Sequence, residues 1–244
     1  MHDGKMSAGP PLQEAARRFE QASGLHFDDK TLLQRALTHR SYLNESREFL
    51  LADNERLEFL GDAVLDFLVG EYLYNRFPEM REGQLTNLRA SLVRQETLAQ
   101  FGAQLDLGCY LLMGRGEADM GGRQRPAILC GAFEALAGAL YLDQGFTAVK
   151  RLIMPLIDPI LPSLARSVEK KDAKSRLQEL CQATLHTTPQ YRTAGTEGPD
   201  HARVFTMNVL IDGEVWGTGQ GLSKRIASQE AAASAVSRLE ALFP

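Results

Sequence analysis

The sequence predicts an all-α domain followed by a small α+β domain with the element order α-β-β-β-α. Apolar residues recur at helical spacing through the first two-thirds of the chain, whereas the last third contains short strand-like segments joined by turn residues. The 244 residues suffice for two modest domains, each with its own core. A composition of 44% hydrophobic and 24% charged residues is typical of globular proteins and excludes collagen-like, disordered and coiled-coil classes.

The sequence also indicates a cellular compartment. No uninterrupted apolar stretch approaches the roughly 18 residues that span a bilayer, and residues 1–20 lack the apolar core of a secretory signal. The three cysteines, Cys109, Cys130 and Cys181, are too widely spaced for a disulfide framework or a paired metal motif. We therefore expect a cytoplasmic protein with no membrane partner.

Four helices are predicted in the first domain. Asp28 and Asp29 are suited to cap the first of them, and Pro78 ends the second. A glycine-rich segment that lacks the lysine of a phosphate-binding loop precedes the fourth helix, and we expect it to be a flexible connection. The helices are expected at residues 32–37, 54–78, 84–98 and 127–142, and the flexible connection at residues 114–122.

A short charged stretch, Arg166–Lys174, is predicted to be a linker, because the composition of the chain changes there. The expected domains are therefore residues 1–168 and 169–244. The pair Asp212-Gly213 is a strong hairpin signal. The second domain is expected to contain a helix at residues 175–185, strands at 190–194, 204–210 and 214–219, and a helix at 227–242.

The second predicted helix carries a stripe of acidic residues. Its members follow one another at spacings of three, four and four, which places them on one helix face: Glu55, Glu58, Asp62 and Asp66. Glu58 and Asp62 have no Lys or Arg three or four positions away, so their mutual repulsion is not offset along the helix. The stripe is either a solvated surface or one side of a site for a divalent cation.

Glu134 is the one ionisable acid in the otherwise apolar segment 127–142. Burying an unpaired carboxylate is costly, so Glu134 needs an explanation. It reaches solvent at an edge, pairs with an arginine such as Arg89, or faces Glu58 and Asp62 across a helix contact. In the last case carboxylate oxygens converge without nitrogen or sulfur ligands, which favours Mg²⁺, with Mn²⁺ as a substitute.

No other catalytic constellation competes with these acids. The GxSxG and HExxH motifs are absent. His39, in the segment THRSY, is interpreted as a structural hydrogen-bonding residue beside a helix end, although it could serve as a ligand or base. Cys130 is interpreted as a core residue, because a soft thiol is a poor ligand for Mg²⁺.

The second domain offers contacts for a phosphate backbone, although the net charge of −4 gives no sign of a nucleic-acid partner. Ser223-Lys224-Arg225 precedes the last helix, whose N-terminus favours phosphate. Gln178-Glu179 lies on the first helix, and Gly198–His201 forms a loop. Three separated contact elements suit A-form double-stranded RNA. The alternative is that Lys224-Arg225 is an ordinary basic start to a surface helix.

These residues carry a resemblance to a known family. The segment NERLEFLGDAVL at Asn54–Leu65 resembles the signature of bacterial ribonuclease III, and the resemblance covers nearly the whole chain in the family's usual domain order. Further matches are THRSY at 38–42, EGQLTNLRASLV at 82–93, GG…R…IL…FEAL from 121 to 136, and, resembling a double-stranded-RNA-binding domain, GPDH at 198–201 and GTGQGLSKRIASQEAA at 217–232.

The resemblance implies a Mg²⁺-dependent endoribonuclease that cleaves double-stranded RNA in the processing of rRNA and mRNA. It implies a homodimer, to which apolar Phe59, Leu60 and Phe67 could contribute, and products with 5′-phosphate and 3′-hydroxyl ends and short 3′ overhangs. The implied metal ligands are Glu58, Asp62 and Glu134, of which Asp62 and Glu134 are catalytic, with Glu55 and Glu82 as accessory acids. The implied RNA contacts are Gln178, Glu179, His201, Ser223, Lys224, Arg225 and Gln229.

One departure from the family pattern affects this site. The pattern has an aspartate three residues before the glutamate of FEA, and this chain has Gly131 there. A water would then take the vacant coordination position, and weaker metal affinity or slower turnover is expected. The same departure supports an alternative: a catalytically weakened double-stranded-RNA-binding protein or processing scaffold. A small-molecule phosphohydrolase is a third candidate, but it would leave the C-terminal domain without a role.

Overall fold

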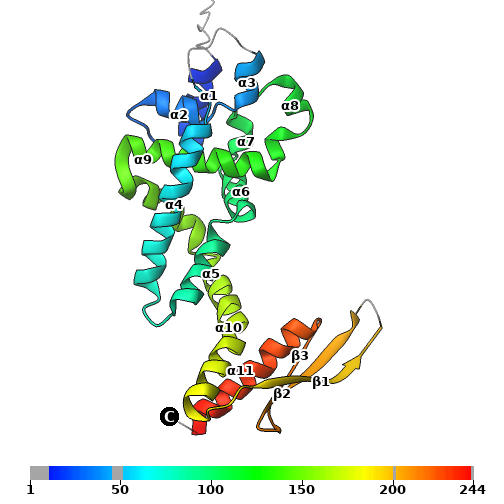
Figure 1. Ribbon diagram of the computed structural model, residues 1–244. Coiled ribbons are helices and arrows are strands. Elements are labelled where there is room, and N and C mark those ends of the chain that lie inside the picture. Colours follow the sequence, from blue (N-terminus) through cyan, green and yellow to red (C-terminus); the bar gives the residue numbers. More distant parts are fainter. Residues whose placement is uncertain (1–10, 46–51, 200–201, 243–244) are drawn as a thin grey trace, which may run out of the picture. The chain divides into compact units, whose positions relative to one another are not determined.

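The computed structural model describes residues 11–45, 52–199 and 202–242, and it confirms the predicted fold class (Figure 1). The chain divides into two compact units, Met1–Leu161 and Pro162–Pro244. The boundary expected between residues 168 and 169 falls slightly beyond this division. Each unit has its own buried core.

The described part of the first unit consists of helices and the turns that join them, with one isolated bridge between Thr38 and Leu112. Its elements are α1 (Pro11–Ser23), α2 (Lys30–Ala36), α3 (Arg40–Glu45), α4 (Glu55–Arg76), α5 (Glu82–Leu92), α6 (Gln95–Gln104), α7 (Leu107–Tyr110), α8 (Arg115–Asp119), the 3₁₀ helix η1 (Gly122–Gln124) and α9 (Pro126–Ile157).

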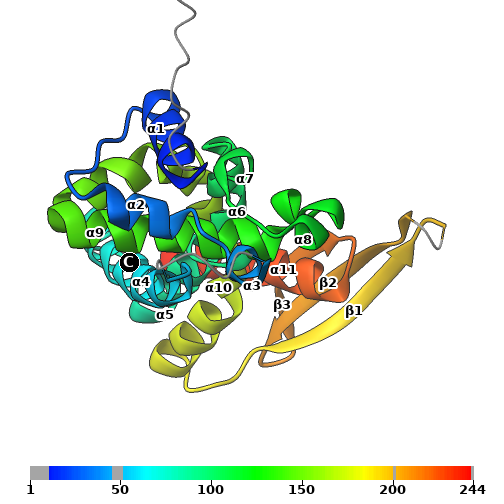
Figure 2. The same ribbon diagram turned by 90° about the horizontal axis from the view of Figure 1, so that it is seen from above.

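Helix α9 forms the centre of this unit, and α2, α4 and α6 pack against it (Figure 2). Its apolar side chains are buried over most of the first half, and Phe133 meets Phe101 of α6 with ring centroids 5.7 Å apart. Leu57 and Leu65 anchor α4 in the same core. Glu58 and Asp62 of α4 and Glu134 of α9 lie on the two helices that cross here.

Helix α9 is the one described helix that is long and apolar enough to cross a membrane by length and composition alone. However, 61% of its most apolar stretch is buried inside the protein. This burial is typical of a core helix, which passes the same test of length and composition.

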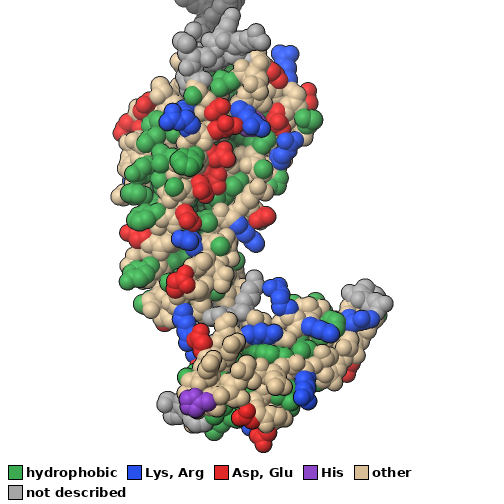
Figure 3. All heavy atoms as spheres, viewed as in Figure 1, with side chains coloured by type: hydrophobic (Ala, Val, Ile, Leu, Met, Phe, Trp, Pro, Cys, Tyr) green, Lys and Arg blue, Asp and Glu red, His purple; other side chains and the backbone are tan. Residues whose placement is uncertain are grey.

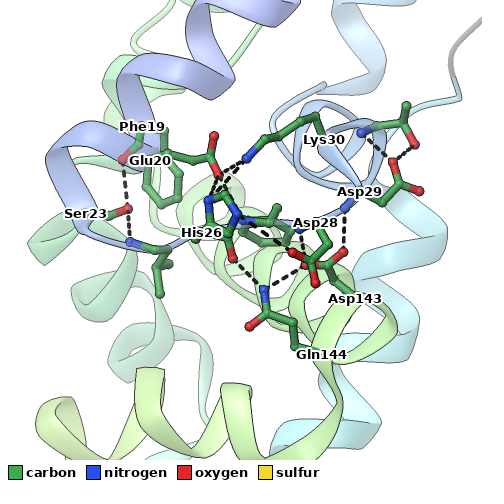
Figure 4. Close-up of polar contacts among 12 residues, drawn as sticks. Phe19, Glu20, Ser23, His26, Asp28, Asp29, Lys30, Asp143 and Gln144 are labelled. Atoms are coloured by element: carbon green, nitrogen blue, oxygen red, sulfur yellow. Dashed lines mark hydrogen bonds and ion pairs between the residues drawn. The ribbon is translucent and has the colours of Figure 1, made fainter.

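Polar contacts tie the chain before α2 to α9 where α9 changes direction (Figure 4). Gly145 adopts φ 74° and ψ −172°, which separates α9 into two helical segments. Just before it, the Asp143 carboxylate accepts hydrogen bonds from the backbone N–H groups of Asp28 and Asp29, both at 2.8 Å. Asp29 in turn caps α2 by accepting from the Thr31 N–H, as its sequence position predicted.

Two predictions about helix boundaries in this unit are wrong. The helix expected at residues 84–98 is two helices, α5 and α6, because Arg94 has an extended backbone and Thr97 bonds back to the Ser91 carbonyl across the turn. The expected flexible connection at residues 114–122 contains α8 and leads into η1. A salt bridge of 2.5 Å between Arg125 and Glu117 fixes that segment.

The second unit is a three-stranded antiparallel sheet covered by helices. Its elements are α10 (Leu161–Thr184, whose first residue belongs to the first unit), β1 (Gln190–Glu197), β2 (Val204–Ile211), β3 (Glu214–Gly221) and α11 (Lys224–Leu242). The strand order is β1-β2-β3, and α11 packs on β2 and β3. Asp212 and Gly213 both have positive φ, the conformation of the tight hairpin that this pair predicted.

The segment Arg166–Lys174 is not an irregular linker, as the sequence suggested, but part of α10. It contains neither Gly nor Pro, and its Lys, Glu and Arg residues are good helix formers. Later residues of α10, Leu177 and Cys181, are fully buried in the core of the second unit together with Val209 of β2 and Ala231 of α11.

Candidate catalytic and RNA-binding sites

Helix α4 presents the acidic stripe on the surface of the first unit, where acidic side chains gather (Figure 3). Its two ends are paired with arginines: Glu55 with Arg40 at 3.3 Å and Asp66 with Arg89 at 3.5 Å. The two middle acids, Glu58 and Asp62, form no ion pair among the described residues. The unpaired charge of the stripe is therefore concentrated at its centre.

Two glycines bring the backbones of α4 and α9 into direct contact beside this centre. A Cβ at Gly61 of α4 would lie 1.8 Å from the carbonyl oxygen of Glu134. A Cβ at Gly138 of α9 would lie 2.3 Å from the carbonyl oxygen of Leu57. Only glycine permits such an approach, so these two positions determine that Glu134 lies opposite the stripe.

Glu134 is partly buried and lacks a cationic partner among the described residues. Arg89, the arginine considered from the sequence, pairs with Asp66 instead. Burial raises the pKa of Glu134 to about 7, although the Cys130 thiol, which donates to Oε1 at 3.4 Å, partly opposes that shift. The charges of Asp62 and Glu58 raise the same pKa further.

Glu58 experiences the same environment. Burial raises its pKa, and the charge of Glu55 adds to the shift, whereas Arg40 opposes it. Burial, followed by the charge of Glu134, likewise raises the pKa of the Cys130 thiol well above its usual range. The structure thus brings Glu58, Asp62 and Glu134 into electrostatic contact, with a protonated thiol beside them.

In the part of the chain that the structure describes, no three His, Cys, Asp or Glu side chains lie close enough together to hold a metal ion. The chemistry of the three acids nevertheless fits a hard divalent cation, because their donors are all carboxylate oxygens. The raised pKa of Glu134 also fits such a cation, because a nearby positive charge would stabilise the ionised carboxylate and lower this pKa.

Glu82, expected to be an accessory acid, lies apart from this group. It is the first residue of α5, is exposed, and accepts a hydrogen bond from the Thr86 hydroxyl at 2.9 Å. Its charge is not among those that act on Glu58 or Glu134. Glu55, the other accessory acid, is next to Glu58 on α4 and raises its pKa.

His39 has the structural role that the sequence favoured. Its Nδ1 lies 2.7 Å from the Ser41 hydroxyl, which also accepts the Gly114 N–H. Burial lowers the pKa of His39, which favours the neutral form of its ring. Cys130 is buried, as expected of a core residue, but the sequence analysis missed its contact with Glu134. Their separation of four residues within one helix was the available signal.

In the second unit the expected RNA contacts lie on α10 and at the start of α11. Lys224 and Arg225 are exposed in the first turn of α11, and the Ser223 hydroxyl accepts the Ile226 N–H there. Gln178 and Glu179 are exposed on α10. His201, expected in the loop contact, lies outside the described residues.

Gln229, another expected contact, accepts the Lys174 backbone N–H at its side-chain oxygen at 3.2 Å. It therefore ties α11 to α10. Gln229 also lines a groove of about 600 Å³ between these helices, together with Arg166 and Arg225. Two arginines in one groove offer donors for a phosphate backbone.

Large apolar side chains are exposed on α4 and α9, along one flank of the first unit (Figure 3). Phe59 is 80% exposed and Phe67 is 58% exposed, on the helix that carries the acidic stripe. Phe67 contacts Phe146 of α9, with ring centroids 5.3 Å apart, and Phe146 is itself exposed. Leu60, expected in the same patch, is partly buried.

Comparisons with known proteins cover both units. Residues 29–160 match the family model described as Ribonuclease-III-like, and residues 173–239 match the double-stranded RNA binding motif. A Ribonuclease 3 of Enterococcus faecalis is 48% identical over 213 residues, which is 87% of this chain and 92% of that protein. A Ribonuclease 3 of Roseiflexus sp. is 47% identical over 219 residues, covering 89% and 92%.

Among solved structures, the nuclease domain of ribonuclease III from Campylobacter jejuni is 43% identical and covers 59% of this chain and 97% of that domain, with a TM-score of 0.54. That structure is described as showing flexibility in a region involved in dimer formation. The chain is therefore similar to known proteins in both of its units, the helical nuclease unit and the RNA-binding unit.

Proposed function

The chain belongs to the ribonuclease III family, and from this premise we propose which of its residues cut double-stranded RNA and which hold it. The protein is an endoribonuclease that acts on double-stranded RNA. The observation that carries the site assignment is the position of Glu134, a partly buried acid with a raised pKa, opposite two acids of α4 that form no ion pair with the residues the structure describes.

Glu58, Asp62 and Glu134 would hold Mg²⁺, or Mn²⁺ as a substitute, through their carboxylate oxygens. When bound, such an ion supplies charge that activates water and stabilises the negative charge of a phosphodiester under attack. The close contact of α4 and α9 supports this proposal, because it brings the backbones that carry the acids opposite one another. Cleavage by water would leave 5′-phosphate and 3′-hydroxyl ends, with short 3′ overhangs where two strands are cut.

Within this site we assign catalytic roles to Asp62 and Glu134. Asp62 is exposed on α4 and can reach an RNA backbone, whereas Glu134 is held on the core helix. The Cys130 thiol donates to Glu134 Oε1 and so orients the carboxylate. Glu55 is an accessory acid that adds negative charge beside Glu58. For Glu82 we propose no contact with the acids of its own chain.

The second unit would hold the RNA duplex. Lys224 and Arg225 extend from the first turn of α11, where unpaired backbone N–H groups add a partial positive charge. Ser223, Gln178 and Glu179 would supply further polar contacts to the RNA, and His201 stays a proposed contact from its sequence position alone. Gln229 contributes chiefly by joining α11 to α10.

We also propose that two copies of the chain associate through the exposed aromatic flank of α4 and α9. Phe59, Phe67 and Phe146 together form an apolar surface beside the acidic stripe, and such a surface marks an interface in soluble proteins. A two-fold dimer places two acidic sites on one assembly, so each can cut one strand. Sedimentation equilibrium of Phe67→Asp should show dissociation to monomer.

The cellular role that we propose is cytoplasmic processing of rRNA and mRNA precursors. The alternative of a catalytically weakened binding protein is not favoured, because similarity to proteins named Ribonuclease 3 extends over about nine-tenths of the chain. Gly131, the residue that motivated this alternative, lies beside the Glu58 carboxylate.

The test replaces Glu134 with Gln, which preserves its shape but removes the charge. Incubation with a labelled RNA duplex and Mg²⁺ should show no cleavage, while binding of the duplex in EDTA should equal that of the unmodified protein. Glu71→Gln is a matched control, because Glu71 is an exposed acid of α4 that pairs with Lys150 at 3.5 Å. Undiminished cleavage by Glu134→Gln would refute the site assignment.

A further inference from the structure

Arg40 lies where the acidic stripe of α4 meets α3. It is the first residue of α3, and its Nη1 lies 3.3 Å from Oε1 of Glu55, the first acid of the stripe. Both side chains are more than half exposed, Arg40 at 69% and Glu55 at 54%. An exposed ion pair that joins one nitrogen to one oxygen contributes little to stability. Stability alone therefore gives no reason for an arginine at this position.

The backbone just before Arg40 is fixed to the start of α4. The Asn54 N–H donates to the Thr38 carbonyl at 3.0 Å, and the His39 N–H donates to the Leu112 carbonyl at 2.9 Å. Asn54 and Thr38 are both buried, so their hydrogen bond is protected from water. The guanidinium of Arg40 thus extends from a fixed backbone beside the acids, and its exposed end is free to meet a ligand there.

Arg40 is also the one cation among the largest charge effects on Glu58 within the described residues. Burial raises the pKa of Glu58, and the charge of Arg40 opposes that shift. Neighbouring acids raise the same pKa further: Glu55, Asp53 and Asp62. An RNA backbone carries a negative charge at each phosphate, so these acids repel it and a cation at their edge attracts it.

We propose that Arg40 is an RNA contact of the first unit, which exchanges its ion pair with Glu55 for a phosphate beside the one that is cut. A guanidinium suits this exchange, because it can donate two parallel hydrogen bonds to a phosphate, whereas its contact with Glu55 uses one nitrogen. The inference rests on the proposed function, which places the cleaved phosphate at the acids of α4 and α9. RNA is then held by both units of the chain.

The test replaces Arg40 with Gln in the full-length protein and follows cleavage of a labelled RNA duplex at saturating Mg²⁺. KM should rise by about tenfold with little change in kcat, because the lost contact holds the RNA equally before and during cleavage. The slope of log KM against log KCl concentration should fall by about one, as for the loss of one phosphate contact. Arg40→Lys should keep that slope, because an ammonium group also pairs with phosphate.

Two controls separate a phosphate contact from a general effect of charge and from a structural role. Arg17→Gln removes a similarly exposed arginine of α1, which pairs with Glu14 at 2.8 Å, and its charge is not among those that act on Glu58. This variant should leave KM and the salt slope unchanged. The Tm of Arg40→Gln should stay within about 2 °C of that of the unmodified protein, because only an exposed ion pair is lost.

An unchanged KM in Arg40→Gln, or an equal rise of KM in Arg17→Gln, would overturn the proposal. So would a salt slope in Arg40→Lys as low as in Arg40→Gln. A fall in kcat alone would make Arg40 a support of Glu58 and would also refute the RNA contact. Failure of the proposed function has a different signature. If Glu134→Gln cleaved RNA normally, the assignment of the acids would fail, whereas KM and the salt slope of Arg40→Gln would still show whether Arg40 binds RNA.

Discussion

The Cα of Gly61 rests against the backbone carbonyl of Glu134, so closely that a Cβ at Gly61 would lie 1.8 Å from that oxygen. The reciprocal contact, between Gly138 and the carbonyl of Leu57, makes the crossing of α4 and α9 nearly backbone to backbone. This backbone contact therefore both packs the two helices together and assembles the acidic site. The contact that buries the two helices also places the α4 acids opposite Glu134.

Replacement of Gly61 by Ala should consequently destabilise the first unit. The added methyl group meets backbone, which cannot rotate away, so the helices must separate at a cost of about 3 kcal/mol or more. Gly70→Ala is a control in the same helix, because its Cβ would meet only the Arg89 side chain at 3.8 Å. The control should gain up to about 1 kcal/mol from helix propensity. Denaturation by urea measures both, and equal stability of the two variants would contradict this explanation.

The sequence predicted the fold class, and it offered the contact of Glu134 with Glu58 and Asp62 as one of three alternatives, because both depend on periodicity. The spacing of Glu58 and Asp62, and the isolation of Glu134 in an apolar segment, were visible without coordinates. The tight turn at Asp212-Gly213 was also visible, since it requires residues that tolerate positive φ. Local patterns of this kind are encoded within a few neighbouring residues.

Features that depend on contacts between residues distant in the sequence could not be predicted from local patterns. The turn at Arg94 contains no Gly or Pro, and the bond from Thr97 to the Ser91 carbonyl is invisible in a helical pattern. The charged composition of segment 166–174 suggests a linker, although its Lys, Glu and Arg residues are also good helix formers. The contact of the Glu58 carboxylate with Gly131 joins residues 73 positions apart, so no local pattern could reveal it.

The raised pKa of Glu134 predicts a pH dependence of stability in EDTA. Burial raises the pKa of Glu134 from an ordinary 4.5 to about 7, so the folded protein binds this proton more tightly than the unfolded chain does. Its stabilising contribution is therefore present below pH 4.5 and is lost as the pH rises to 7. After allowance for solvent screening at this partly exposed group, the loss is on the order of 1 kcal/mol.

Glu134→Gln should escape that loss, and its free energy of unfolding in EDTA should exceed that of the unmodified protein at pH 8 but not at pH 4.5. Chemical denaturation at the two pH values measures the free energy of unfolding of each protein. Because both proteins have the same histidines, the histidine contribution cancels in the difference between them. Adding Mg²⁺ at pH 8 should stabilise the unmodified protein and not the variant. A constant difference across the pH range would show that Glu134 is not perturbed.

Asp143 should matter for folding rather than for cleavage. Its carboxylate accepts the backbone N–H groups of Asp28 and Asp29, which would otherwise lose their partners beside α9. Asp143→Ala should lower the free energy of unfolding by about 0.5–1.5 kcal/mol, the usual net contribution of a hydrogen bond, because these N–H groups belong to exposed residues that water can reach. Asp119→Ala, at an exposed position at the end of α8, should change it little. Thermal denaturation compares the two, and the Mg²⁺ dependence of cleavage should remain normal in both.

The phosphate contacts assigned to the start of α11 predict a change in salt dependence. Each phosphate contact releases counterions when RNA binds, so log Kd rises with log salt concentration in proportion to the number of contacts. Lys224→Ala and Arg225→Ala should each reduce that slope by about one and weaken binding of all duplex sequences alike. Arg238→Ala is the control on the same helix, because its guanidinium stacks 4.8 Å from the Trp216 ring centroid and donates to the Val215 carbonyl. Filter binding between roughly 50 and 300 mM KCl measures the slopes. If Arg238→Ala reduced the slope as much as Lys224→Ala does, the duplex would not lie on the N-terminal turn of α11.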